Sequence, residues 1–152
     1  MPAQASFTPI AALMFLSGVG IPIMAAWNAA LGQQLGSTVA ATFVLFVVGV
    51  ALATLAMLIA GQTIDVSRLT VDRPHLYFGV VFMLFYALSI TWAAPRIGVG
   101  NAVFFVLLGQ LVAAAAIDHL GLWGAVKAQI TARRVTGIAL MAAGVWLARK
   151  QG

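Results

Sequence analysis

Polar side chains inside long apolar stretches are the residues of this chain that could bind or move a solute. Asp118 is the only acid at the end of such a stretch, in which Asn101 and Gln110 are the other polar side chains from residue 99 onward. Asn28 and Tyr86 lie within two earlier apolar stretches. A polar group in a membrane helix is costly unless it faces another helix or water, so these five residues are candidates for substrate binding or coupling.

Three of these candidates also have a purely structural interpretation. Asp118 could couple transport to an ion, or it could be solvated or paired with Lys127 or Arg133. Asn28 and Gln110 could line a polar cavity from facing helices, or they could form one structural hydrogen bond without contacting a solute. The sequence leaves both alternatives open.

An aromatic face accompanies the fourth candidate. Phe78, Phe82 and Tyr86 follow one another at helical spacing and could line a cavity for a cationic or aromatic solute. The alternative is that these rings face lipid, with Tyr77 and Trp92 marking the two membrane interfaces.

Small residues and a proline interrupt the first apolar stretch. Pro22 removes a backbone donor, so we expect a kink or local opening where Gly18 and Gly20 already allow close backbone approach. These three residues are hinge candidates. Alternatively, Gly18, Pro22, Ala25 and Ala29 form a smooth seam for a neighbouring helix.

The composition of the chain indicates that membrane-spanning helices position these candidate residues. Of 152 residues, 63% are hydrophobic and 7% charged, against roughly a quarter charged in a soluble domain. Lipid must therefore cover the surface. We predict one membrane domain over residues 1–152, an all-α polytopic transmembrane bundle of about five helices. The expected spans are 9–31, 38–60, 75–94, 99–118 and 131–148.

Several kinds of chemistry are missing from the sequence. It has no His or carboxylate pair at metal-binding spacing, no Gly-rich phosphate loop with a Lys, and no nucleophile arrangement. The eight Lys and Arg lie at segment ends rather than in a basic patch, which argues against nucleic-acid binding. We therefore expect a protein that is not an enzyme and needs no cofactor or metal.

The last span carries a candidate dimer interface. Gly137, Gly144 and Ala148 lie within about 40° of one another around a helix and leave a groove for a partner. The connections expected on the side of the N-terminus hold five Lys and Arg, against three on the other side. This bias favours a cytoplasmic N-terminus so weakly that insertion both ways round, and hence an antiparallel pair, is permitted.

Short motifs along nearly the whole chain resemble a known superfamily. Arg134-x-x-Gly137, Leu140 and Gly144-Val145 look like the last helix of small multidrug resistance transporters. A related half-size, five-helix branch of the drug/metabolite transporter superfamily, assigned to inner-membrane export, is similar in its other motifs. These are Pro22, Asn28-Ala29-x-Leu31-Gly32, Pro95-Arg96-x-Gly98, Gly109-Gln110 and Asp118-His119-x-Gly121.

The resemblance implies a multi-pass protein of the bacterial inner membrane that moves small metabolites or xenobiotics as a pair of subunits. One feature departs from it. Small multidrug resistance proteins couple export to a glutamate in their first helix, and this chain contains no Glu. That proton-exchange site cannot be transferred to this chain.

Our functional hypothesis is a secondary transporter, most simply an exporter, that works as a dimer by alternating access. Its partners would be the lipid bilayer, a small-molecule substrate, and a second copy or a paired homologue. The alternative is a non-transporting small membrane subunit that packs beside a larger membrane protein. A transporter needs convergent polar groups at membrane depth, whereas an adaptor needs only packing seams.

Overall fold

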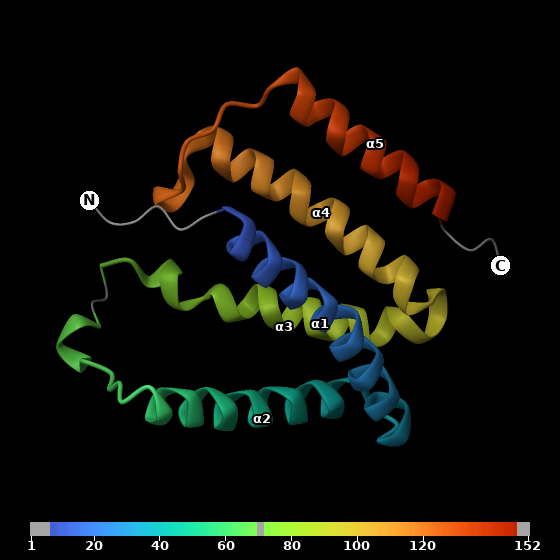
Figure 1. Cartoon of the computed structure of the whole chain (residues 1–152). Helices are drawn as coiled ribbons and strands as arrows, with labels where there is room; N and C mark the ends of the chain where they lie inside the picture. Colours follow the sequence, from blue (N-terminus) through green and yellow to red (C-terminus); the bar gives the residue numbers. More distant parts are fainter. Residues whose placement is uncertain (1–6, 70–71, 149–152) are drawn as a thin grey trace. The chain divides into compact units, whose positions relative to one another are not determined.

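The described part of the chain is built from helices. The computed structural model describes residues 7–69 and 72–148, with the backbone alone for residue 148. Within these ranges the chain forms five α-helices, three short 3-10 helices and no strand, which confirms the predicted all-α fold (Figure 1). The elements are α1 (Phe7–Gln34), α2 (Thr38–Ile59), η1 (Val66–Arg68), η2 (Pro74–Tyr77), α3 (Gly79–Ile97), α4 (Val99–Leu120), η3 (Leu122–Gly124) and α5 (Ala132–Ala148).

Within the described ranges, four segments are long and apolar enough to cross a membrane. They are Phe7–Gln34, Thr38–Ile59, Pro74–Ile97 and Val99–Leu120. Helix α5 has 17 residues and is shorter than these, so the fifth crossing stays a prediction. The reversal expected over residues 95–98 is concentrated at one residue, because α3 continues through Pro95 and the chain turns at Gly98, whose φ is 84°.

The chain divides into two compact units, Met1–Pro95 and Arg96–Gly152. In the first unit, the helices meet through small side chains, which allow close approach of membrane helices. A Cβ added to Gly32 of α1 would lie 3.2 Å from Thr91 Cγ2 of α3 and 3.7 Å from Ala41 Cβ of α2, so three helices meet there. The buried residues of this unit are Ala25, Asn28, Ala29, Gly32, Ala41, Thr42, Ala87, Ile90, Thr91 and Ala94.

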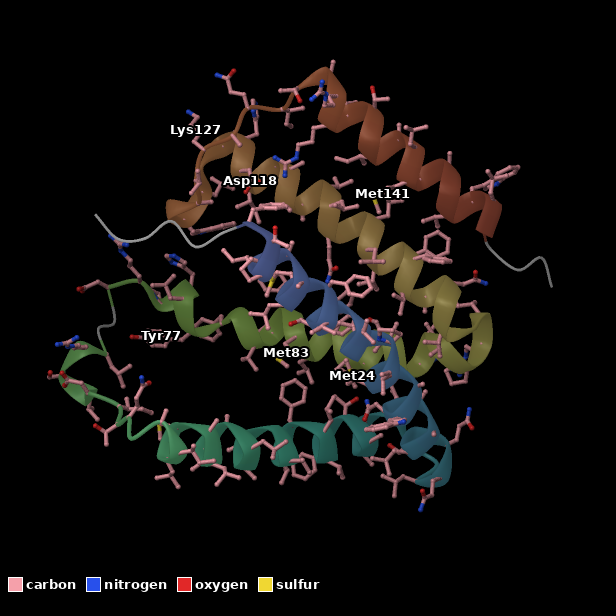
Figure 2. The ribbon with its side chains drawn as sticks, in the orientation of Figure 1. Met24, Tyr77, Met83, Asp118, Lys127 and Met141 are labelled. Atoms are coloured by element: carbon pink, nitrogen blue, oxygen red, sulfur yellow. The ribbon has the colours of Figure 1, made fainter. Side chains whose placement is uncertain are left out.

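The second unit contains α4, η3 and α5, and its two long helices α4 and α5 pack side by side (Figure 1). Gly121 ends α4 in the left-handed conformation, with φ 63°. The connector then folds back on the helix end, because the Ala128 N–H donates to the Asp118 carbonyl oxygen at 2.9 Å and the Ile130 N–H to His119 Nδ1 at 3.2 Å. Figure 2 shows Asp118 and Lys127 at this end of the unit.

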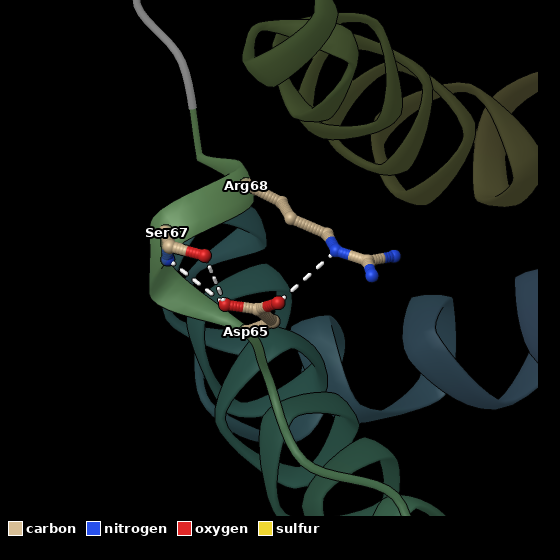
Figure 3. Close-up of polar contacts among 3 residues, drawn as sticks. All are labelled: Asp65, Ser67 and Arg68. Carbon is tan, nitrogen blue, oxygen red and sulfur yellow. Dashed lines mark hydrogen bonds and ion pairs between the residues drawn. The ribbon is translucent and has the colours of Figure 1, made fainter.

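The hydrophilic loop between α2 and α3 contains a locally satisfied turn. Asp65 caps η1 by accepting hydrogen bonds from the Ser67 hydroxyl and N–H, and it pairs with Arg68 at 3.0 Å (Figure 3). The bond from the Ser67 hydroxyl is the main cause that lowers the pKa of the Asp65 carboxyl, followed by the Ser67 N–H and, less strongly, Arg68. All these partners lie within three residues, as expected of a solvated connector rather than a site.

Candidate functional site

A pocket of about 500 Å³ lies between α1 and α2 in the first unit. Its volume is within the range of small-molecule sites in proteins. The α1 wall starts near the middle of the helix and extends over roughly 17 Å toward the turn that leads into α2. Met24 marks this wall in Figure 2. The lining residues are Gly20, Ile23, Met24, Trp27, Asn28 and Leu31 of α1 with Val44, Leu45 and Val48 of α2.

Asn28 is the one amide among these lining residues, and Trp27 adds an indole N–H, which can only donate. It is 5% exposed, and its Nδ2 donates a hydrogen bond to Thr91 Oγ1 of α3 at 2.5 Å. Thr91 is itself buried, so α3 fixes the Asn28 amide from one side of α1. A primary amide offers two N–H donors and a carbonyl oxygen, of which this bond uses one donor. Asn28 therefore retains hydrogen-bonding capacity at the pocket.

Two buried hydroxyl oxygens of the first unit have no hydrogen-bond partner among the described residues. They are Thr42 Oγ1 of α2 and the phenolic oxygen of Tyr86 on α3. An unsatisfied buried hydroxyl costs roughly 1–3 kcal/mol, so a water molecule or a polar solute would be favoured beside each. The sequence singled out Tyr86 by its place on an aromatic face. It did not single out Thr42 or Thr91, because a threonine in an apolar helix resembles any other small packing residue.

The remaining amide candidates lie in the second unit. Asn101 makes a local contact one turn back along the chain, with Nδ2 donating to the Ile97 carbonyl oxygen at 2.8 Å. Gln110 is exposed on α4. The hydrogen-bond partner of Asn28 is Thr91, which lies in the same unit. That Asn28 also faces Gln110 across a cavity stays a prediction.

Asp118 forms an ion pair with Arg134 at 2.7 Å, with each side chain about one-third exposed. The partner differs from the expected Lys127 or Arg133. Arg134 belongs to the half-buried face of α5. Arg133 points about 100° away from it around the helix, so Arg133 lies outside that face and is exposed. The pair joins the last turn of α4 to the first turn of α5. Among the described residues, no three His, Asp or Glu side chains gather as metal ligands.

We expect Asp118→Asn and Arg134→Gln to weaken the contact between α4 and α5 to a similar extent. Each variant removes the same partly exposed pair, which contributes up to about 1 kcal/mol to the free energy of unfolding. Thermal unfolding of both single variants and the double variant in detergent measures this. The double variant should lose little more than either single one, and fully additive losses would mean that the two side chains do not stabilise each other.

The hinge candidates belong to an uninterrupted helix. Helix α1 continues through Pro22, so no break in the helix marks the local opening that we expected there. Gly20 lines the pocket, and Gly18 is exposed. Of the alternative seam, Ala25 and Ala29 are buried, which places the packed part of α1 after Pro22. Movement at these glycines stays a prediction.

The glycines of α5 lie outside its contact with α4. Gly137 and Gly144 are exposed, and within the second unit no atom lies within 4 Å of a Cβ built on either of them. The side chain of Ala148 lies outside the described residues. The half-buried face of α5 is a different one, about 100° around the helix. It consists of Arg134, Ile138, Ala142 and Val145.

Comparison with known families adds one match. The model of a family described as "Putative inner membrane exporter, YdcZ" matches residues 9–147. No curated protein and no solved structure matches the chain.

Proposed function

Because the chain belongs to the YdcZ family of inner membrane exporters, we propose that it is a secondary transporter that carries a small metabolite or xenobiotic out of the cell. It is a multi-pass inner membrane protein, and the described residues include four helical segments able to span the bilayer. The observation that carries the proposal is the pocket between α1 and α2, with the buried Asn28 amide in its lining. A polar side chain held at a pocket within membrane helices is typical of a substrate pathway.

We further propose that two copies cooperate by alternating access. The face with Gly137 and Gly144, which α4 does not cover in the second unit, gives a second copy a surface on which helix backbones can approach closely. The near balance of Lys and Arg on the two sides supports insertion in either orientation, and an inverted pair would offer the same pocket to both sides of the membrane. A paired homologue could take the place of the second copy.

The decisive experiment is export by the purified protein alone in liposomes, with a panel of small metabolites and xenobiotics. We expect Asn28→Leu to reduce the transport rate roughly tenfold, because it removes the one amide in the lining of the pocket. Gln33→Leu is the matched control, since it makes a similar change on an exposed position of the same helix.

Two results would contradict this proposal. Equal transport by wild type and Asn28→Leu would remove the pocket from the pathway. Absence of transport with the protein alone, and its appearance only beside a larger membrane protein, would favour the adaptor function instead.

The same liposomes test the coupling role of Asp118. If Asp118 couples transport to an ion, Asp118→Asn should abolish the pH dependence of the transport rate because the ionisable carboxyl is gone. Arg134→Gln keeps that carboxyl and should keep a pH-dependent transport rate. An ion pair that only joins α4 to α5 predicts the same pH profile for wild type and both variants.

A further inference from the structure

The pocket between α1 and α2 offers no charge to a bound molecule. None of its lining residues is ionisable. Up to the end of α3 the Asp, Lys and Arg residues are four in the loop that follows α2, within residues 65–73, and Arg96 in the last turn of α3. The pocket ends at Val48, and the eleven residues from there to the end of α2 span roughly 17 Å. A buried charge is costly unless it is paired, and a cation or an anion in the pocket would find no counter-charge among the lining residues.

The pocket offers few hydrogen-bonding groups to a ligand, and the amide of Asn28 supplies most of them. Asn28 donates one N–H to Thr91 and retains the other N–H and its carbonyl oxygen. A hydroxyl or amide group of a ligand could both donate to and accept from these atoms. Trp27, Met24 and the aliphatic residues around Asn28 suit an apolar or aromatic body.

We propose that this pocket selects an uncharged amphipathic molecule, with an apolar body against Trp27 and Met24 and one hydroxyl or amide hydrogen-bonded to Asn28. This assignment rests on the proposed export function but concerns the chemical class of the substrate. The ligand is expected to be uncharged because no lining residue is ionisable. It is expected to carry one hydroxyl or amide because Asn28 has one N–H and one carbonyl oxygen left to bond. Loss of a matched hydrogen bond at such a site reduces affinity by about fivefold to tenfold.

Three probes of one shape test the assignment: 2-(1-naphthyl)ethanol, 2-(1-naphthyl)ethylammonium and 1-naphthylacetate. Binding to the full-length protein is measured by titration calorimetry in detergent, with detergent alone as the blank and with Leu45→Trp, which narrows the pocket, as a comparison. We expect the alcohol to bind at least about tenfold more tightly than either ion. In Asn28→Leu the alcohol should bind about fivefold more weakly.

Asn28→Asp provides the sharpest test, because it adds a charge to the pocket at nearly constant side-chain size. The Nδ2 donor to Thr91 is lost, and the Thr91 hydroxyl can donate to the new carboxylate instead. Above the pKa of the new carboxyl, the ammonium compound should become the preferred ligand, whereas Gln33→Glu, which adds an acid to an exposed position of α1, should keep the preference for the alcohol. Circular dichroism checks that each variant is folded. If Asn28→Asp does not fold, Asn28→Leu and the three probes still decide the proposal.

Equal or tighter binding of either ion by the wild type would overturn the proposal. Failure of all three probes to bind the folded wild type would also overturn it and point to a lipid tail or a partner helix as the occupant. These outcomes are separate from export. If the alcohol binds selectively but is not transported, the ligand class proposed for the pocket is supported and the proposed export function is contradicted. If ions are transported, the export function is supported and the proposed substrate class is contradicted.

Discussion

Gly32→Leu is expected to prevent close packing of the first unit and to lower the yield of folded protein sharply. A Cβ at this position would already lie 3.2 Å from Thr91 Cγ2 and 3.7 Å from Ala41 Cβ. Leucine places three further carbon atoms where α1, α2 and α3 meet, and such overpacking costs roughly 1–3 kcal/mol or more in the free energy of unfolding. Thermal unfolding in detergent, followed by circular dichroism, measures the loss.

The chain offers a matched control for this substitution. Gly49 lies in the interior of α2, is exposed, and has no atom within 4 Å of a built Cβ. Gly49→Leu should therefore unfold at the wild-type temperature or above it, because leucine is also the better helix former. Gly32→Ala should fall between Gly32→Leu and wild type. Equal unfolding temperatures for Gly32→Leu and Gly49→Leu would show that the contact at Gly32 does not hold the unit together.

Gly144→Leu is expected to convert the proposed dimer into a monomer. The exposed glycine face of α5 can approach another backbone only while no side chain stands between them. A leucine at its centre would separate two α5 helices and remove most of their contact. Chemical cross-linking in membranes and size-exclusion chromatography with light scattering both report the change.

The control for Gly144→Leu is the adjacent residue. Ala143 is exposed and lies about 100° around the helix from Gly144, so Ala143→Leu should remain dimeric. A dimer that persists in Gly144→Leu would exclude this face as the interface. The relative orientation of the copies is tested separately with single cysteines at each terminus, which is straightforward because the chain contains no cysteine. Labelling of every N-terminus from one side would exclude the inverted pair.

The sequence was sufficient to predict that the chain is a helical membrane protein. A chain that crosses a bilayer must satisfy its backbone groups internally, as a helix or a closed barrel, and continuous apolar stretches of about twenty residues indicate the helix. The start of α2 at Thr38 was likewise legible, because Ser37 supplies the capping side chain and accepts from the Ala40 N–H. Asn28 stood out for a similar reason, since a lone amide in an apolar helix must find a partner.

The identity of that partner required the tertiary structure. Thr91 lies 63 residues after Asn28, and only the packing of α3 against α1 brings the two side chains together. Likewise, the sequence showed that Asp118 lies near several cations, but the face that α5 turns toward α4 selects Arg134. Such pairings depend on which faces of two helices meet, and the pattern of residues along one helix does not contain that information.

The pocket shows the same division between sequence and structure. Apolar residues of α1 and α2 follow from the composition of any membrane helix, and nothing in their order distinguishes those that face lipid from those that face a cavity. The contact at Gly32 draws the helices together at one point, while the larger side chains from Gly20 to Leu31 and from Val44 to Val48 enclose the space. The sequence therefore determined that a polar group must be accommodated in the membrane. Only the packing of three helices decided that Asn28 lies at a pocket, because a cavity is defined by the distance between helices and not by either helix alone.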